Sequence, residues 1–373
     1  MSDLANTPLS DTPALDRTGS VGSAPRVRFP VLRAALRVQR AEVVALVVLA
    51  VGITVYVGLA MAFLHRSLSP GETLAAAIAS AIFFLVPVLV GISIFGPSCT
   101  SEYRTPTVRL LWTQGVSRTR WILAKLAVAG IAVAAVTSGL VFLSNWWLGD
   151  LARTHAPRPL GVGIANAPTG LEEAHFALAG PVFVAYALFS LALATFLGTL
   201  IRRKAWPAIA AAVVYIGVLS FVGAGLRPHY MAPARETGVS AYTGMLPTGS
   251  MGVASGWAPR GSTRMLPYTH HLASLEWNCS QSAAGPSTPP NSIRTYFGVI
   301  PAGSQVWQQL LQGSGISTHA LIACMRNHGF TYIATYQPPS RYWAFEGIES
   351  GILLALAAVL VLAAVFRVRR MNA

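Results

Sequence analysis

Long apolar stretches alternate with shorter polar segments along this chain. A bilayer core of about 30 Å is crossed by roughly 20 apolar residues in a helix that rises about 1.5 Å per residue. Helices in the core of a soluble protein would carry charged outer faces, which these stretches lack. We therefore predict six membrane-spanning helices, at 43–64, 73–95, 122–143, 176–200, 207–226 and 348–366.

The composition agrees with a chain that folds in lipid. Of its 373 residues, 53% are hydrophobic and 11% are charged, whereas soluble domains carry about 25% charged residues. Lysine and arginine number 27, against 13 aspartates and glutamates. Such an excess often indicates nucleic-acid binding. Here the basic residues flank the apolar stretches, so membrane topology explains them and no nucleic-acid partner is expected.

The basic residues also predict an orientation, because cytoplasmic loops of membrane proteins are enriched in lysine and arginine. With a cytoplasmic N-terminus, the inside segments are 1–42, 96–121, 201–206 and 367–373. Together with Lys125 they contain 17 of the 27 basic residues. We expect a multi-pass protein of the plasma (inner) membrane with both termini in the cytoplasm.

Two segments precede the first span. Residues 1–30 are rich in Ser, Thr, Pro and Ala without periodicity, which is typical of a disordered terminus. Residues 31–42 place apolar side chains opposite Arg33, Arg37 and Arg40. This pattern fits an amphipathic helix at the membrane surface, and it fits equally well a basic flank that marks the start of the span.

A small extracytoplasmic domain is predicted at 227–347, between the fifth and sixth spans, with the sixth span and a basic tail following at 348–373. The expected fold class is an all-α polytopic membrane protein with six transmembrane helices and this small unit. The first part of the unit, rich in Pro, Gly, Ser and Thr, has the composition of loops. Its later part predicts a helix over 305–312 capped by Ser304, a helix capped by Thr318 that ends near Gly329, and a strand over 330–336.

Three cysteines are distributed between two compartments in this topology. Cys279 and Cys324 lie in the extracytoplasmic domain, and Cys99 lies at the cytoplasmic end of the second span. A disulfide forms on the oxidising side, so Cys279–Cys324 is the natural pair. Closing this loop of about 45 residues would stabilise the domain by about 4 kcal/mol. The alternative is two free buried thiols.

Sequence motifs for catalysis or ion coupling are not found. A phosphate-binding loop needs Gly-Lys-Ser/Thr, and the two lysines, Lys125 and Lys204, stand in other contexts. Ion-coupled pumps carry ionisable groups in mid-membrane. The six spans contain Lys125 and Glu349, each expected within about a turn of an end, which argues against such a pump.

One group of potential metal ligands lies in the extracytoplasmic domain. His270, His271, Glu276 and Cys279 follow no regular ligand spacing, so we interpret the histidines as surface residues of a loop. We predict no catalytic residues, no metal site and no cofactor bound by this chain.

The polar interruption between the second and third spans contains its own structural signals. Apolar and basic residues at 102–114 predict a short helix at the inner surface, and Gly115 can end it. Ser117 can cap the third span, with Val116 and Trp121 spaced as a hydrophobic staple. We predict a rigid cytoplasmic elbow that is presented to a cytoplasmic partner. The alternative is that its arginines merely fix topology.

The elbow resembles permease subunits of ABC transporters of the type-two exporter class, especially the actinobacterial branch. The run at 336–352 also looks like the start of that family's last span. Pro106 departs from the family pattern, which has glycine there. The matching residues of the elbow are Glu102, Thr107, Arg109, Leu110, Trp112, Thr113, Gln114, Ser117, Arg118, Arg120, Trp121 and Lys125.

The resemblance implies a transmembrane permease subunit that exports an unidentified, amphipathic substrate. It implies a second permease copy, identical or not, and a cytoplasmic ATPase subunit that uses the ATP. The helix at 102–114 would be the coupling helix that docks on the ATPase. The alternative from another class is a membrane anchor or sensor that displays the 227–347 unit. The residues expected to couple to the ATPase are Glu102, Thr107, Arg109, Trp112, Thr113, Gln114, Arg118 and Trp121.

Small residues four positions apart occur in two spans, at Gly347 and Gly351 and at Ala194 and Gly198. Such pairs let membrane helices approach closely, and they predict a contact between two permease copies. They also occur by chance in an alanine-rich chain.

Overall fold

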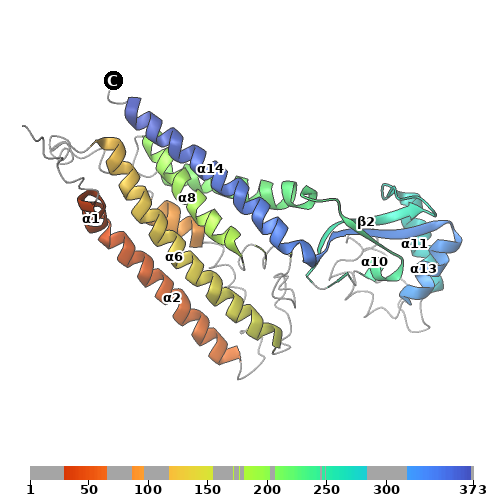
Figure 1. The fold of residues 1–373 in the computed structure, drawn as a ribbon. Coiled ribbons are helices and arrows are strands. Elements are labelled where there is room, and N and C mark those ends of the chain that lie inside the picture. The colour runs from red at the N-terminus through yellow and green to blue at the C-terminus, as the bar shows by residue number, and fades with distance from the viewer. Residues whose placement is uncertain are drawn as a thin grey trace, which may run out of the picture.

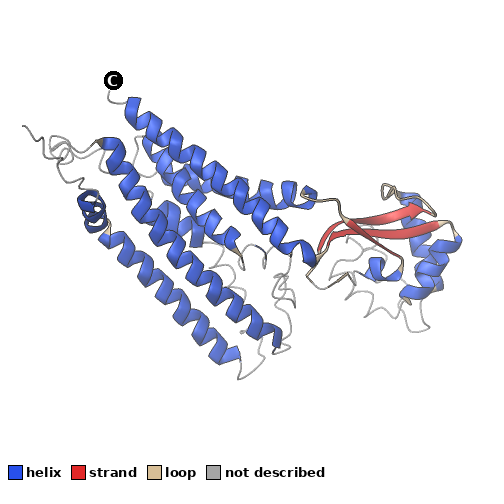
Figure 2. Cartoon of the chain, viewed as in Figure 1, coloured by secondary structure: helices blue, strands red, loops and turns tan. Residues whose placement is uncertain are grey.

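The computed structural model consists of a bundle of long helices and a smaller unit that contains a sheet (Figures 1 and 2). Four helices are long and apolar enough to cross a membrane, and a bent pair of helices near the N-terminus makes a fifth candidate. Of the predicted second span, residues 86–95 are described, and they are helical. The structure describes residues 29–64, 86–95, 117–153, 171, 176, 180–201, 206–243, 246–247, 249–283 and 317–370.

The helices of the bundle coincide with the predicted spans and extend some of them. The helix of the third predicted span begins at Arg118, four residues earlier than predicted, and that of the sixth begins at Tyr342, six residues earlier. The helix of the fourth span begins at Pro181, a residue suited to a first helical turn. The bounds are α1 Phe29–Val38, α2 Arg40–Leu64, η1 Leu89–Phe95, α6 Arg118–Arg153, α8 Pro181–Leu200, α9 Trp206–Ser220, η3 Phe221–Leu226, η4 Arg227–His229 and α14 Tyr342–Arg370.

The segment before the first span forms a helix of its own. The axis of α1 is bent by 58° from that of α2, with the break at Gln39. Ala35 is fully buried and packs on α6, whereas Leu32 and Leu36 are exposed. Residues 31–42 therefore do more than flank the span with charge, because α1 packs against a neighbouring helix.

Helix α8 is the centre of the bundle. It packs against α6, α9, α14 and η1, and two-thirds of its apolar window is buried inside the protein. A helix that is apolar on all sides suits such a position. One core cluster joins α8 to α2, η1 and α6 through residues such as Leu46, Val90 and Phe183, and another joins it to α9 and α14 through residues such as Tyr215 and Phe345.

The closest approach in the bundle lies between η1 and α8, at Gly91 and Ser190. A Cβ atom on Gly91 would overlap the Ser190 hydroxyl and the backbone of Leu191. The single hydrogen of the Ser190 hydroxyl is shared between the carbonyl of Pro87 at 2.5 Å and that of Ala187 at 2.8 Å. Small residues permit such close backbone contacts in membrane bundles.

The smaller unit, which we call the sheet unit, is built on three antiparallel strands: β1 Ala234–Thr237, β2 Met251–Pro259 and β3 Phe330–Gln337. Their order is β1-β3-β2. Tyr332 and Trp257 lie directly opposite each other and form a core with Tyr242. Three helices pack on this core: α10 Val239–Thr243, α11 His270–Ser282 and α13 Thr318–Asn327.

The sheet unit corrects several expectations. The predicted strand at 330–336 is confirmed, but the loop-like interpretation of the preceding region is wrong because it contains β1, β2 and α11. The fold is therefore mostly helical and not purely all-α. Helix α13 is capped by Ser317 and not by Thr318, and it ends close to Gly329, whose φ is +85°. The predicted helix at 305–312 lies outside the described residues.

Glu276 lies in the core of the sheet unit, whereas His270 and His271 are exposed as predicted but begin α11 and do not lie in a loop. Glu276 is 1% exposed, and its carboxylate accepts hydrogen bonds from the hydroxyls of Tyr242 at 2.8 Å and Tyr268 at 2.6 Å. Burial raises the pKa of the Glu276 carboxyl, and these hydroxyls partly offset the effect. The carboxylate thus ties α11 to α10 and to the segment that precedes α11.

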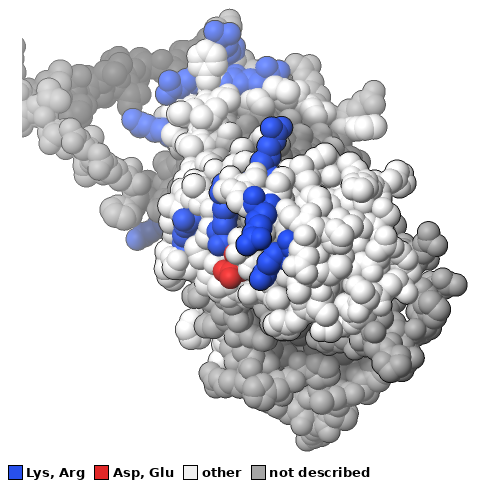
Figure 3. Space-filling view, turned by 90° about the vertical axis from the view of Figure 1, so that its right-hand side faces the viewer, with Lys and Arg blue, Asp and Glu red and all other residues white. Residues whose placement is uncertain are grey.

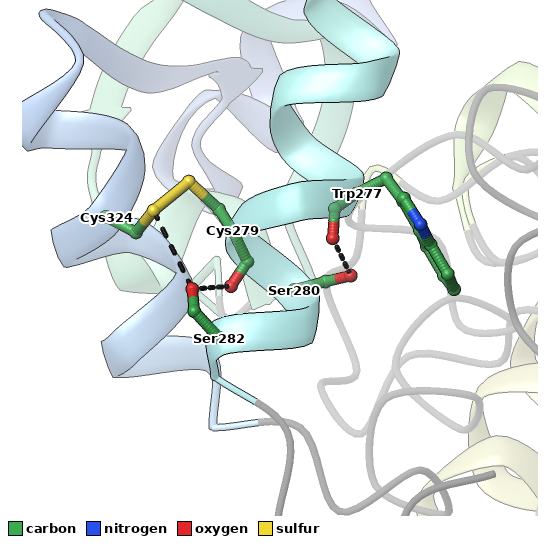
Figure 4. Close-up of a disulfide and its surroundings, with 5 residues drawn as sticks. All are labelled: Trp277, Cys279, Ser280, Ser282 and Cys324. Carbon is green, nitrogen blue, oxygen red and sulfur yellow. Dashed lines mark hydrogen bonds between the residues drawn. A yellow bond between two sulfur atoms is a disulfide. The ribbon is translucent and has the colours of Figure 1, made fainter. Parts of the chain in front are cut away.

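The predicted disulfide between Cys279 and Cys324 is present and joins α11 to α13 (Figure 4). The Cα atoms are 5.6 Å apart, within the usual range for a disulfide. Ser282 lies beside it and donates a hydrogen bond to the Cys279 carbonyl at 2.9 Å. The bond joins two helices of the sheet unit through cysteines that lie 45 residues apart in the sequence.

The contact at Gly91 predicts a selective packing defect. Gly91→Ala should lower the stability of the protein in detergent by about 1–3 kcal/mol, because the added methyl group has to displace α8. The measurement is thermal unfolding of the purified chain. Gly139→Ala is the matched control, since a Cβ atom there meets nothing within 4 Å. Equal melting temperatures for the two variants would contradict the contact.

Candidate functional site

The predicted coupling residues Glu102, Thr107, Arg109, Trp112, Thr113 and Gln114 lie outside the described residues. Arg118 is the first residue of α6, and the structure describes its backbone but not its side chain. Trp121 is described. The start of α6, which follows the predicted elbow directly, is therefore the part of the coupling region that the structure defines.

The start of α6 is capped as predicted. The Ser117 hydroxyl accepts a hydrogen bond from the backbone N–H of Arg120 at 3.4 Å, and the Ser117 carbonyl accepts one from Trp121 at 3.1 Å. Trp121 is 7% exposed, and the ammonium of Lys125 lies 6.0 Å from its ring centroid. The first turns of α6 are thus fixed by local contacts.

Two other helices contact the start of α6. Trp121 packs against Ala35 of α1. The next residue, Ile122, is 1% exposed and packs against Val365 and Val368 in the last turns of α14. We call these five residues the α6 anchor. A displacement of the start of α6 would therefore change its contacts with both α1 and α14.

A polar cluster lies at the end of the bundle opposite the α6 anchor, next to the sheet unit. The guanidinium of Arg227 donates two hydrogen bonds to Glu349 of α14, Nε to Oε2 at 2.9 Å and Nη2 to Oε1 at 2.8 Å. The Tyr186 hydroxyl of α8 donates to the same carboxylate at 2.7 Å. Arg227 is 2% exposed and Glu349 is fully buried. Two parallel bonds between guanidinium and carboxylate are a strong, directional arrangement.

Glu346 satisfies the N-terminus of α8. Gly180 precedes this helix and offers no capping side chain, so the backbone N–H of Val182 donates instead to Glu346 Oε2 at 2.8 Å. A Cβ atom at Gly180 would overlap the Glu346 carboxylate, so any other residue there would force that side chain to move. A helix N-terminus favours a negative charge, which offsets the cost of burying this acid. We call Tyr186, Arg227, Glu346 and Glu349 the polar joint.

Aromatic rings enclose the polar joint. The Phe176 ring centroid lies 4.3 Å from Arg227 Cζ, which is a cation–π contact. Phe176 also meets the ring of Tyr342 edge-on, with centroids 5.7 Å apart. These rings separate the charges of the joint from solvent.

The sheet unit is attached directly beside the polar joint. Gln337, the last residue of β3, donates hydrogen bonds to the carbonyls of Pro228 at 3.1 Å and Met231 at 2.6 Å. Arg341 donates to the Gln337 side-chain carbonyl at 2.6 Å. The end of β3, the start of α14 and the end of the fifth span therefore form one hydrogen-bonded connection.

Sequence reasoning missed the polar joint. Glu349 was expected within about a turn of a helix end, which is wrong because α14 begins at Tyr342, about two turns earlier. Arg227 was expected in a loop. The spacing of Glu346 and Glu349, three residues apart on one helix face, and an arginine directly after an apolar span were the available signals.

Other predicted site residues give no further chemistry. Gly347 and Gly351 are exposed, and a Cβ atom at either meets nothing within 4 Å, so their predicted contact with a second copy stays a prediction. Among the described residues, one group has metal-like spacing: Cys279, Cys324 and His328. Both of its sulfur atoms are in the disulfide, so this group offers no thiolate ligands.

The polar joint predicts a large difference between single and double substitutions. Arg227→Met should cost about 3–5 kcal/mol, because it leaves Glu349 buried without its cationic partner. The double variant Arg227→Met, Glu349→Leu removes both charges and should recover most of that loss. Thermal unfolding in detergent measures both. If the loss of stability in the double variant equals the sum of the losses in Arg227→Met and Glu349→Leu, the pairing is contradicted.

Comparison with known proteins adds one finding. Residues 43–227, just under half of the chain, match the family model described as ABC-2 membrane transporter related. No curated protein and no solved structure matches. The matched region runs from α2 to Arg227, so it includes the predicted elbow and the α6 side of the anchor.

Apolar helices and this family match indicate a multi-pass membrane protein. Permeases of the ABC-2 family are membrane subunits without an ATPase site of their own, and the family implies an ABC ATPase partner. Over residues 43–227 the chain is therefore similar to ABC-2 type membrane transporter subunits.

Proposed function

We propose that this chain is the transmembrane subunit of an ATP-driven exporter. A separate ATPase subunit binds and hydrolyses ATP, and the substrate is an amphipathic molecule that is not yet identified. Glu102, Thr107, Arg109, Trp112, Thr113, Gln114, Arg118 and Trp121 couple the two subunits. The observation that carries the proposal is the α6 anchor, because it joins the helix that follows the elbow to α14.

The proposed route of coupling begins at the elbow. ATP binding shifts a membrane equilibrium only through a contact that differs between its two states. The elbow at 102–114 provides that contact, and it leads within a few residues to Ser117 and α6. Trp121 and Ile122 then transmit a displacement of α6 to α1 and α14.

Helix α14 continues the route to the sheet unit. It is unbroken over 29 residues, a length of about 44 Å at 1.5 Å per residue. Val365 and Val368 contact α6 near one end, and Glu346 and Glu349 lie in the polar joint near the other. A displacement of α14 therefore strains the joint and the connection to β3.

The orientation that fits this route places the α6 anchor in the cytoplasm and the sheet unit outside. Arg367, Arg369 and Arg370 end α14 next to the anchor, in agreement with the excess of basic residues on the inside of membrane proteins. The disulfide of the sheet unit suits an oxidising compartment. The protein then lies in the plasma membrane with both of its termini in the cytoplasm.

A second permease copy completes the proposed transporter. On α14, Gly347 and Gly351 leave an open face that contacts no other described helix. That face suits the close approach of a partner helix, from an identical or a related chain.

The elbow assignment predicts a specific loss of coupling. Trp112→Ala should preserve expression and membrane insertion but lose the ATPase during co-purification, because truncation of a buried interface tryptophan costs about 2 kcal/mol or more. Stimulated ATP turnover should disappear with it. Trp343→Ala is the matched control, since Trp343 is exposed near the opposite end of α14. A Trp112→Ala variant that retains its ATPase would refute the assignment and favour an anchor or sensor role.

The α6 anchor predicts a variant that binds the ATPase without responding to it. Ile122→Ala removes the contact with Val365 and Val368, so ATPase co-purification should persist while the ATP turnover of the complex falls. Leu123→Ala, at the neighbouring exposed position, should change neither quantity. The readout is ATP turnover in reconstituted vesicles. Identical turnover in the two variants would show that α14 receives no movement from α6.

A further inference from the structure

The end of the sheet unit farthest from the helix bundle carries three exposed arginines. Arg260 and Arg264 lie in the turn that follows β2, and Arg326 lies in the last turn of α13. Figure 3 looks at this end of the molecule and shows a group of basic side chains, with one acidic side chain beside them in this view. We call Arg260, Arg264 and Arg326 the basic tip.

Backbone hydrogen bonds hold the three arginines together. The N–H of Arg260 donates to the carbonyl of Gly329 at 2.7 Å, and the N–H of Gly329 donates to the carbonyl of Arg326 at 3.0 Å. The N–H of Arg264 donates to the Ser262 hydroxyl at 3.1 Å, within the same turn. The backbone positions that carry these three arginines are therefore held by a folded scaffold.

No acidic residue neutralises the basic tip within the described structure. Residues 228–345 contain two acids, Glu236 and Glu276. Glu276 is buried and bonded to two tyrosines. Glu236 lies opposite Ala334, about 13 Å along β3 from its first residue at 3.3 Å per residue. In the described residues none of the three arginines forms an ion pair, and their mutual repulsion is left unopposed.

Membrane topology does not account for these charges. In the proposed orientation the sheet unit is outside, where the positive-inside rule gives arginine no role. The basic tip also lies away from the helix bundle. Phe330 is about 23 Å along β3 from Gln337, which is bonded to the end of the fifth span, and the sheet unit projects away from the bundle (Figure 1).

The surroundings of the basic tip distinguish between kinds of partner. Interfaces between folded proteins have a core of apolar and aromatic side chains. At 259–264 and 326–329 the exposed positions are Pro, Arg, Gly, Thr, Asn and His, and the large exposed apolar side chains within four residues of Arg264 are Leu266 and Tyr268. Several guanidinium groups without an apolar core suit a ligand with repeated anionic groups, and each guanidinium can bond a phosphate through two parallel hydrogen bonds.

We propose that the basic tip binds a linear polymer with repeated phosphate groups on the extracytoplasmic side. Arg260, Arg264 and Arg326 each contact a phosphate of one strand. Binding is electrostatic and weakens as the salt concentration rises, because releasing counterions from the polymer then gains less free energy. The site is separate from the α6 anchor and the polar joint, so it extends the proposed function without depending on the ATPase.

The test uses the full chain in nanodiscs and a fluorescent, short-chain linear polyphosphate as the probe. The triple variant R260Q/R264Q/R326Q should bind at least about tenfold more weakly, and the slope of log affinity against log salt should fall by about two. R33Q/R37Q/R40Q is the matched control, because it removes three exposed arginines from the other end of the molecule, and it should bind as the unchanged chain does.

Four results would overturn the proposal. They are unchanged binding by the tip variant, an equal loss in the α1 variant, equally tight binding of polyglutamate, and equally effective competition by vesicles of phosphatidylglycerol. The third would indicate an acidic polypeptide as partner and the fourth a lipid surface. A non-reducing gel that shows the Cys279–Cys324 bond verifies folding of the variant, and if the triple variant fails to fold, the three single variants should each give a partial loss.

Discussion

The ion pair between Arg227 and Glu349 is the interaction on which the arrangement of the bundle and the sheet unit depends. Burying two charges is costly, and the cost is met only when every partner is in place at once. Those partners come from the end of the fifth span, from α14 and, through Tyr186, from α8. Three helices and the base of the sheet are therefore fixed relative to one another by one cluster.

The same cluster gives α14 its mechanical importance. Helix α14 carries Glu346 and Glu349 near its start and packs on Ile122 near its end, so it connects the polar joint to the helix that follows the elbow. A buried ion pair tolerates few intermediate geometries, because a partly separated pair leaves charges without partners. Such a contact suits a bundle that alternates between two states, as the proposed ATP-driven transport would require.

The sequence predicted the parts of this protein that are decided by solvent and local chemistry. Long apolar runs specify membrane helices whatever their neighbours are, and the Ser117 cap and the Cys279–Cys324 bond were predicted from local signals and from compartment. Strand β2 was missed because Gly252, Ala254 and Gly256 weaken its local preference, and it forms through its pairing with β3. The polar joint was missed because Arg227 and Glu349 are 122 residues apart and meet only in the folded chain. The elbow residues stay predictions, since they lie outside the described structure.

The central claim is that movement of α6 reaches the polar joint through α14. The most direct measurement is the distance between spin labels at two exposed positions on either side of the joint, Trp343 on α14 and Phe221 on η3, in the complex with its ATPase. We expect the distance distribution to shift between the nucleotide-free and the ATP-trapped complex. An unchanged distribution in a complex that still hydrolyses ATP would contradict the account.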